Sequence, residues 1–284
     1  MSDPPPNLSP DAFAGTAEYY LRYRLPYPTA MLDDLCERAG VTGGRLLDLA
    51  CGPGRIALDL APRFAEVWAL DFEPQMIAVG RAEAGRRGLG NLRWLVGRAE
   101  DLAAPASGFA LITIGDAFHR LDQPLIARRC LEWLAPGACL ATMGGPGATV
   151  GSEPWQKAAR DVVRRYARHA SPGDGGPPEW GAQNEVLRRA GFADVADHDF
   201  GHTHEWTTES IIGHVYSTSY GSKAQLGDRA AAFEAELTAA LMAAEPSGRF
   251  RQEATFGYTL ARRAIGEVSH GRTGSGRRRP AGPA

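Results

Sequence analysis

The sequence has no long hydrophobic run, and no stretch approaches the roughly 20 apolar residues that a transmembrane helix needs. Its first residues, MSDPPPNLSPD, have neither a positively charged n-region nor an apolar h-region, so no secretion signal is predicted. Cysteine is scarce, with 4 residues in 284 and no CxxC spacing, which argues against a disulfide framework. We therefore expect a cytoplasmic protein with reduced thiols and no membrane contact.

Positive charge is also in short supply, because 31 Lys and Arg stand against 33 Asp and Glu. Several of these arginines fall near the end of the chain, so the remainder is more acidic than the net charge of −2. Nucleic-acid binding needs a surface rich in lysine and arginine to contact phosphates. We therefore predict no nucleic-acid partner, with monomer and homodimer both open.

Apolar, strand-like runs alternate with helical segments in the first half of the chain. The expected strands are 45–50, 66–71, 92–97, 109–115 and 138–144. Continuous apolar strands separated by helices are typical of the α/β class, with a parallel sheet covered on both faces. Ligands of such sheets collect at the carboxyl ends of the strands, where Asp48, Asp71 and Asp116 fall.

The second half changes rhythm after Gly145. Further helices are expected at 153–170, 184–192, 207–221 and 227–246, and further strands at 195–206 and 249–263. The predicted organisation is a flexible arm (1–16), a core with an N-terminal lid helix (17–145), a cap that includes the sixth strand (146–225), a C-terminal helix with the last core strand (226–265), and a disordered tail (266–284).

The segment LLDLACGPGRIALDL, residues 46–60, combines a strand, a turn of small residues and the start of a helix. Backbone N–H groups at such a helix start can hold a polar ligand. GPGRIA fits the dinucleotide pattern G-x-G-x-x-G/A, and Asp71 follows 17 residues after Gly54, so an NAD(P)-dependent oxidoreductase is one interpretation. Asp48, however, lies where a pyrophosphate-binding loop needs no anion. A carboxylate there favours a ligand with a positively charged end.

One anion near a sulfonium or ammonium, and a second on a ribose, describe S-adenosylmethionine better than a dinucleotide. Five motifs, in order, resemble the class I S-adenosylmethionine-dependent methyltransferases of the small-molecule kind, the subgroup of the ubiquinone and natural-product enzymes. They are LLDLACGPGRIAL (46–58), VWALDFEPQMI (67–77), GRAEDL (97–102), FALITIGDAFHRLDQP (109–124) and EWLAPGACL (132–140). The resemblance implies a Rossmann-like, mostly parallel sheet of seven strands whose last strand is antiparallel, plus a helical cap.

The resemblance also implies a set of cofactor-binding residues. They are Arg24, Tyr27, Asp48, Ala50, Gly52, Gly54, Asp71, Phe72, Met76, Ala99, Glu100 and Gly115. Asp71 would bind the ribose hydroxyls, and the guanidinium fork of Arg24 suits the methionine carboxylate. Ala50 stands where the family's loop has its first glycine. We expect a negative φ there, because alanine avoids conformations that only glycine adopts easily.

Some of these residues also have a purely structural interpretation. Asp48 could cap the helix that follows it, since a carboxylate accepts hydrogen bonds from the free N–H groups of a first turn. Phe72 and Met76 could be ordinary core side chains, because aromatic residues at strand ends usually pack. The sequence alone leaves both interpretations open.

Methyl transfer is an in-line displacement on an activated sulfonium, so alignment and the exclusion of water come first. A hydroxyl or ammonium acceptor must still lose a proton. His119, four residues after Gly115, is the candidate base, and Asp116 is a second candidate for activating the acceptor; His119 could equally be a hydrogen-bonded loop histidine. His202 and His204 share one face of a strand, but no third ligand can be named, so we assign no metal.

The sequence therefore predicts a methyltransferase (EC 2.1.1.-) with S-adenosylmethionine as cofactor and S-adenosylhomocysteine as product. The acceptor would be an oxygen or nitrogen of a small molecule. The Ala-, Arg- and Gly-heavy composition is associated with bacterial enzymes that modify natural products such as sugars, amines or polyketides. The rival functions are an NAD(P)-dependent oxidoreductase and a non-catalytic S-adenosylmethionine-binding protein.

Overall fold

A computed structural model of the chain describes residues 13–167 and 180–265. Most of the predicted arm and all of the predicted tail lie outside these residues. The strands are β1 (Arg45–Leu49), β2 (Glu66–Asp71), β3 (Leu92–Val96), β4 (Phe109–Gly115), β5 (Leu134–Gly144), β6 (Ala193–Thr207) and β7 (Arg249–Arg262). The helices are α1 (Ala17–Tyr23), α2 (Thr29–Ala39), α3 (Arg55–Leu60), α4 (Pro74–Arg86), α5 (Gln123–Trp133), α6 (Pro154–Tyr166), α7 (Trp180–Ala190), α8 (Thr208–Tyr216), α9 (Lys223–Leu226) and α10 (Ala230–Ala244).

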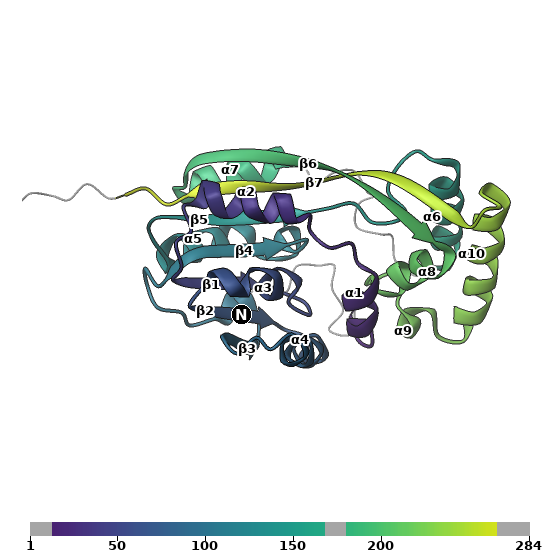
Figure 1. Cartoon of the computed structure of the whole chain (residues 1–284), viewed down its shortest axis with the longest axis horizontal. Coiled ribbons are helices and arrows are strands. Elements are labelled where there is room, and N and C mark those ends of the chain that lie inside the picture. Colours follow the sequence, from purple (N-terminus) through teal and green to yellow (C-terminus); the bar gives the residue numbers. More distant parts are fainter. Residues whose placement is uncertain (1–12, 168–179, 266–284) are drawn as a thin grey trace, which may run out of the picture.

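The seven strands form a single sheet in the order β3-β2-β1-β4-β5-β7-β6 (Figure 1). Neighbouring strands from β1 to β5 pair in parallel, whereas β7 is antiparallel to both β5 and β6. The predicted fold class, a Rossmann-like, mostly parallel sheet with an antiparallel last strand, is confirmed. The strand order reverses at β1, whose neighbours are β2 and β4, so ligands are expected at the carboxyl ends of these strands.

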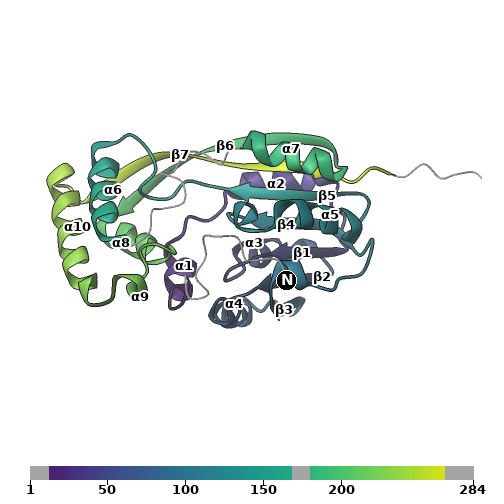
Figure 2. The same ribbon diagram turned by 180° about the vertical axis from the view of Figure 1, so that it is seen from behind.

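Alternating side chains of the central strands supply two separate cores, one on each face of the sheet. Leu46 points into one core with α2, α3 and the helical cap, and Leu47 points into the other with α5 and α7. Because successive side chains of a strand point to opposite faces, strands without polar gaps require helices on both sides. Figure 2 shows α5 and α7 together on one of these faces.

Strands β6 and β7 are much longer than the rest of the sheet. Only Gly257–Arg262 of β7 pairs with β5, whereas its preceding half pairs with β6 alone. This two-stranded ribbon leaves the sheet and carries a lobe that contains α6, α8, α9 and α10 (Figure 1). The lobe is closed by Phe233, Leu237 and Phe250, all nearly fully buried, so it has its own apolar packing.

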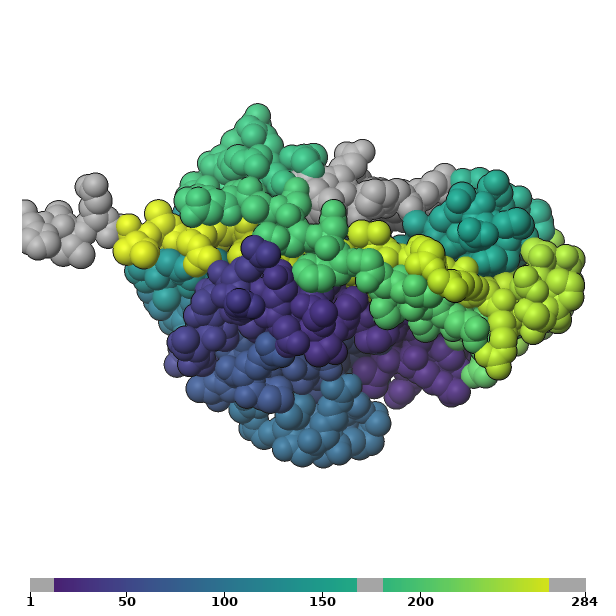
Figure 3. Space-filling model, turned by 45° about the horizontal axis from the view of Figure 1, so that its top comes forward, coloured from purple at the N-terminus to yellow at the C-terminus, as the bar shows by residue number. Residues whose placement is uncertain are grey.

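The N-terminal helix α1 lies between the sheet and the lobe, where Figure 3 shows the purple segment beside the green and yellow one. Its close approach to α8 depends on Gly213, because a Cβ there would lie 2.3 Å from Cδ2 of Tyr23. The expected helix 207–221 is shorter in the structure, since α8 ends at Tyr216. The hydroxyls of Ser217 and Thr218 bond to carbonyls one turn back and so compete with further helix.

The backbone at Ala50 differs from the expectation. Its φ is +52°, in the left-handed region, so the prediction of a negative φ was wrong. The loop must turn sharply between Leu49 and the helix, and it is held there because Cys51 N donates to Leu70 O at 2.9 Å. The surrounding structure therefore imposes a conformation that costs an alanine about 1–2 kcal/mol.

Two substitutions at this position test the strain. Ala50→Gly should raise the free energy of unfolding by up to about 1 kcal/mol, since relief of the strain outweighs the added chain entropy of glycine. Ala50→Val should lower it by more than about 1 kcal/mol, because a β-branched residue is poorly tolerated at positive φ. Denaturant unfolding of both variants measures the effect, and equal stability of the two would contradict a left-handed Ala50.

Candidate active site

A cavity of about 500 Å³, its open mouth included, lies at the carboxyl ends of β1 and β4. One part of its wall comes from the two strand ends and α3, and another from α1, α8, β7 and the residues after β5. The lining residues are Tyr20, Arg24, Leu25, Tyr27, Asp48, Ala50, Cys51, Arg55, Ile56, Gly115, Asp116, Gly145, Pro146, His214 and Phe256.

Asp48 lines the floor of the cavity and is fully buried. One carboxylate oxygen accepts from the Thr113 hydroxyl at 2.8 Å, and the other accepts from Ala57 N, in the first turn of α3, at 3.2 Å. Asp48 thus stabilises the start of the helix and also faces the cavity, so its two interpretations are compatible. Burial raises the pKa of Asp48 to about 7, and a bound cation would favour its ionised form.

Asp116 forms the opposite side of the floor, directly after β4. Its carboxylate accepts from the Tyr27 hydroxyl at 3.2 Å and from Gly145 N at 3.3 Å. Burial raises the pKa of Asp116, although the nearby Arg24 guanidinium opposes this shift. The φ of Asp116 is +50°, in the left-handed region. Among the described residues that line the cavity, Ala50 is the other non-glycine residue with such a backbone. Such backbone strain is characteristic of functional sites.

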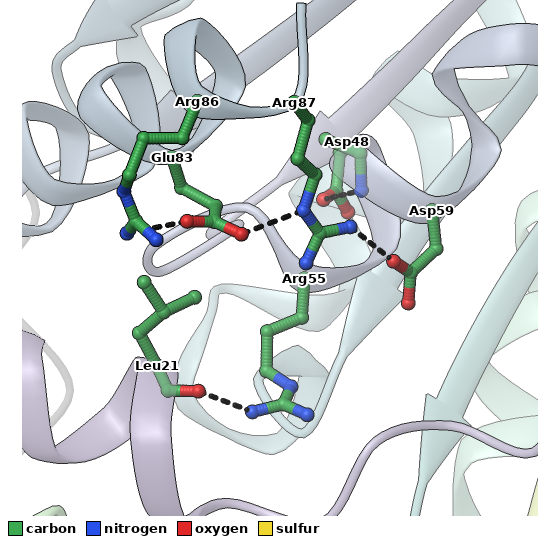
Figure 4. A network of polar contacts seen from close by, with 8 residues as sticks. Leu21, Asp48, Arg55, Asp59, Glu83, Arg86 and Arg87 are labelled. Atoms are coloured by element: carbon green, nitrogen blue, oxygen red, sulfur yellow. Dashed lines mark hydrogen bonds and ion pairs between the residues drawn. The ribbon is translucent and has the colours of Figure 1, made fainter.

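Two arginines attach α1 to its surroundings. Arg55 donates to the backbone carbonyls of Tyr20 and Leu21, at the carboxyl end of α1 (Figure 4). Arg24 donates to the Ser217 hydroxyl at 2.9 Å and lies 4.9 Å from the ring centre of Tyr20. The helix therefore covers the cavity as a lid that is held from the core on one side and from α8 on the other.

The residues predicted to hold ribose and adenine lie outside this cavity. Asp71 is only 6% exposed, and its two oxygens accept from Gly52 N at 2.8 Å and Glu73 N at 2.9 Å. Each oxygen keeps a second lone pair, so the carboxylate can still accept a ligand hydroxyl. Beside it, Phe72 is 37% exposed and Met76 is buried.

The other members of the predicted adenine region lie in the turn after β3. Ala99 is buried, and Glu100 is half-buried and accepts from Asp122 N at 3.3 Å. Both follow β3, whose last residue, Val96, pairs with Asp71 at the end of β2. The roles of Asp71, Phe72, Met76, Ala99 and Glu100 stay predictions.

His119 lies in a short 3-10 turn, Phe118–Arg120, after β4. It is exposed and is absent from the residues that line the cavity. Partial desolvation and the neighbouring Arg120 lower the pKa of His119, so its imidazole is neutral at pH 7. The structure therefore brings Arg24, Tyr27, Asp48, Ala50, Gly115 and Asp116 together and places His119 elsewhere.

The structure also adds residues that sequence reasoning did not single out as site residues, above all Arg55, His214 and Phe256. In the sequence, His214 lies among the apolar residues Ile211, Ile212 and Val215. These neighbours are typical of a helix in an apolar core, so nothing in the local sequence indicates a functional histidine. On β6, His202 and His204 stack 6.3 Å apart, and no cluster of three metal-ligating side chains occurs in the described part of the chain. None of the helices described is long and apolar enough to cross a membrane.

Residues 46–137 match the family model described as a methyltransferase domain. Nocamycin O-methyltransferase of Saccharothrix syringae is 29% identical over 78% of this chain and 85% of its own length. Demethylmenaquinone methyltransferase of Geobacillus kaustophilus is 33% identical over 37% of this chain; the chain spans about half of that relative, 52%. A putative type II methyltransferase from Anaeromyxobacter dehalogenans has a TM-score of 0.57 at 22% identity, covering 86% of this chain and 98% of that one.

These matches, the motifs and the sheet support a class I S-adenosylmethionine-dependent methyltransferase of the small-molecule type. S-adenosylmethionine is its cofactor. The cavity suits the methionine end of that molecule, because buried carboxylates face the space that a cationic group would fill and a guanidinium stands beside it.

Cofactor binding should depend on pH through Asp48. Its pKa is about 7 in the cofactor-free protein, and a cation lowers it, so binding below pH 7 must release a proton. Affinity for S-adenosylmethionine should therefore fall as the pH drops below 7, by at most about tenfold per pH unit. Calorimetry at pH 6 in buffers of different ionisation enthalpy measures the released proton. The Asp48→Asn variant should release fewer protons on binding than wild type. Equal proton release by the two proteins would show that Asp48 is not the source of the pH dependence.

Removing the Asp71 charge tests the ribose assignment. Asp71→Asn should weaken cofactor binding by about 1–3 kcal/mol, since charge-assisted hydrogen bonds to the ribose hydroxyls are lost. Asp59→Asn, on the exposed side of α3, is the matched control and should bind normally. Calorimetric titration with S-adenosylhomocysteine gives both affinities, and unchanged binding in Asp71→Asn would remove the assignment.

Proposed function

We propose that the protein transfers the methyl group of S-adenosylmethionine to a hydroxyl oxygen of a small molecule, inside the cavity between the sheet and α8. The observation that carries the proposal is the pair of carboxylates, Asp48 and Asp116, that line one cavity under the lid α1. The cofactor supplies an electrophilic methyl group on a sulfonium and leaves as the neutral thioether.

The residues of the chain have separate tasks in this proposal. Asp48 and Asp116 face the positively charged part of the cofactor, and Arg24 binds its carboxylate. Tyr27 donates to Asp116 and fixes that carboxylate. Arg55 holds the lid closed through the end of α1, so water is excluded and the reacting groups are aligned. No role is given to His119, because it lies outside the cavity lining.

The acceptor class rests on chemistry and on one relative. The far wall combines the Phe256 ring, Pro146 and His214, an apolar surface with a single polar group that suits a planar or cyclic hydroxylated molecule. The relative that covers most of this chain is named for O-methylation of nocamycin. A natural-product intermediate with a free hydroxyl is therefore the proposed acceptor, in the cytoplasm.

Turnover on two simple probes tests this function. The full chain should form S-adenosylhomocysteine with catechol faster than with benzylamine, because the proposed acceptor atom is oxygen; mass spectrometry measures the product of each. Faster reaction of benzylamine would move the proposal to nitrogen. In a thermal-shift comparison, stabilisation by NAD and none by S-adenosylhomocysteine would contradict methyl transfer altogether and favour an oxidoreductase.

A further inference from the structure

A buried histidine without a hydrogen-bond partner lines the cavity. His214, on α8, is 2% exposed, and its Nδ1 atom has no partner among the described residues. Buried polar atoms are nearly always paired, and an unpaired one costs free energy unless a ligand or water completes it. Because His214 is also part of the cavity wall, the missing partner points to a ligand.

Packing, rather than hydrogen bonding of the ring, fixes the imidazole. The indole of Trp206 meets it edge-on with the ring centres 5.4 Å apart, and a Cβ on Gly147 would lie 2.8 Å from its Cε1. The backbone of His214 is held too, because the Ser217 hydroxyl donates to its carbonyl and itself accepts from Arg24. The side chain is therefore positioned on a rigid element next to the residue proposed to bind the cofactor.

The other titratable groups of the cavity either have a task in cofactor binding or are protonated. Asp48 and Asp116 each accept two hydrogen bonds from protein groups, and the proposed function uses both for the cationic cofactor. Burial raises the pKa of the Cys51 thiol well above its ordinary value, which leaves it protonated. The arginines have no lone pair to offer, and the tyrosines are protonated at neutral pH. Nδ1 of His214 therefore offers the remaining lone pair that can accept a proton.

We propose that Nδ1 of His214 accepts the proton of the methyl acceptor, which makes His214 the catalytic base of the reaction. This inference rests on the proposed function. The O–H bond of the acceptor breaks as an N–H bond forms at Nδ1, and the oxygen takes the methyl group. The electron pair of the broken S–C bond stays on sulfur, and the imidazolium returns its proton to water when the product leaves.

The charges around the ring agree with this role. Burial, with Arg24 in second place, holds the pKa of His214 well below its ordinary value, so the imidazole is neutral before the reaction. Tyr20, Tyr27 and Asp116 are the other titratable groups near this part of the cavity. The reacting groups carry one positive charge before and after the reaction. It is on the sulfur before methyl transfer and on the imidazolium afterwards. The reaction therefore adds no net charge to the buried site.

Three single variants of the full chain separate the possibilities. His214→Asn keeps a polar atom near the position of Nδ1 but cannot take a proton. His198→Asn, on β6 and outside the cavity lining, is the matched control, and His119→Asn tests the rival histidine. For each variant, calorimetry measures the affinity for S-adenosylhomocysteine and single-turnover assays measure methyl transfer to catechol. Thermal unfolding checks that each variant is folded.

A second readout does not require turnover. In the full chain labelled with ¹⁵N-histidine and saturated with S-adenosylhomocysteine, catechol should shift the imidazole signal that is missing in His214→Asn. The expected kinetic result is a loss of about 100-fold or more in kcat for His214→Asn, with S-adenosylhomocysteine affinity within twofold of wild type. His198→Asn should match wild type in both.

Three results would overturn the inference. They are a catechol-induced shift on the signal of His119 instead, no shift of any histidine signal, and a kcat within threefold of wild type in His214→Asn. Failure of the proposed function would look different, since wild-type protein would then give no heat with S-adenosylhomocysteine. Should His214→Asn not fold, His214→Gln takes its place in the same measurements.

Discussion

The structure depends on two carboxylates, Asp48 and Asp116, that line one cavity. Asp48 lies fully buried between β1 and α3, and Asp116 closes the end of β4 beside Tyr27. Burial raises the pKa of both groups, to about 7 for Asp48, so burial opposes their ionised forms. A cationic ligand would favour the ionised carboxylates and so offset the cost of burying them. The site would therefore bind a cation more tightly than a neutral ligand of the same shape. In the proposed function, this acidic floor favours a sulfonium cofactor over a pyrophosphate.

The lid and the lobe follow from the same constraint, because charges interact strongly only where water is excluded. Helix α1 covers the floor and is held by Arg55 from below and through Arg24 and Ser217 from α8. The ribbon of β6 and β7 projects the lobe beyond the sheet, so that α8 can face the ends of β1 and β4 (Figure 1). Pro146, His214 and Phe256, which form the proposed acceptor wall, all lie outside the matched residues 46–137.

The sequence predicted the central sheet well because each strand is a short apolar run bounded by glycine, proline or a charged turn. It also placed Asp48 and Asp116 at the ends of β1 and β4, where both line the cavity. The conformation of Ala50 could not be predicted from its own preference, because the hydrogen bond from Cys51 to Leu70 decides it. Likewise, the position of His119 depends on how the 3-10 turn leaves β4, and spacing along the chain does not contain that information. His214 was missed because its neighbours in sequence are those of a core helix, and only tertiary packing brings it to the cavity.

The most direct test of the central claim compares two ligands that differ by one methyl group and one charge. Calorimetry of the intact chain at pH 8 should show 1:1 binding of S-adenosylmethionine, and Asp48→Asn should weaken the binding of this cation more than that of neutral S-adenosylhomocysteine. An equal loss for both ligands, or no heat with either of them, would contradict an account in which buried carboxylates recognise the positive charge.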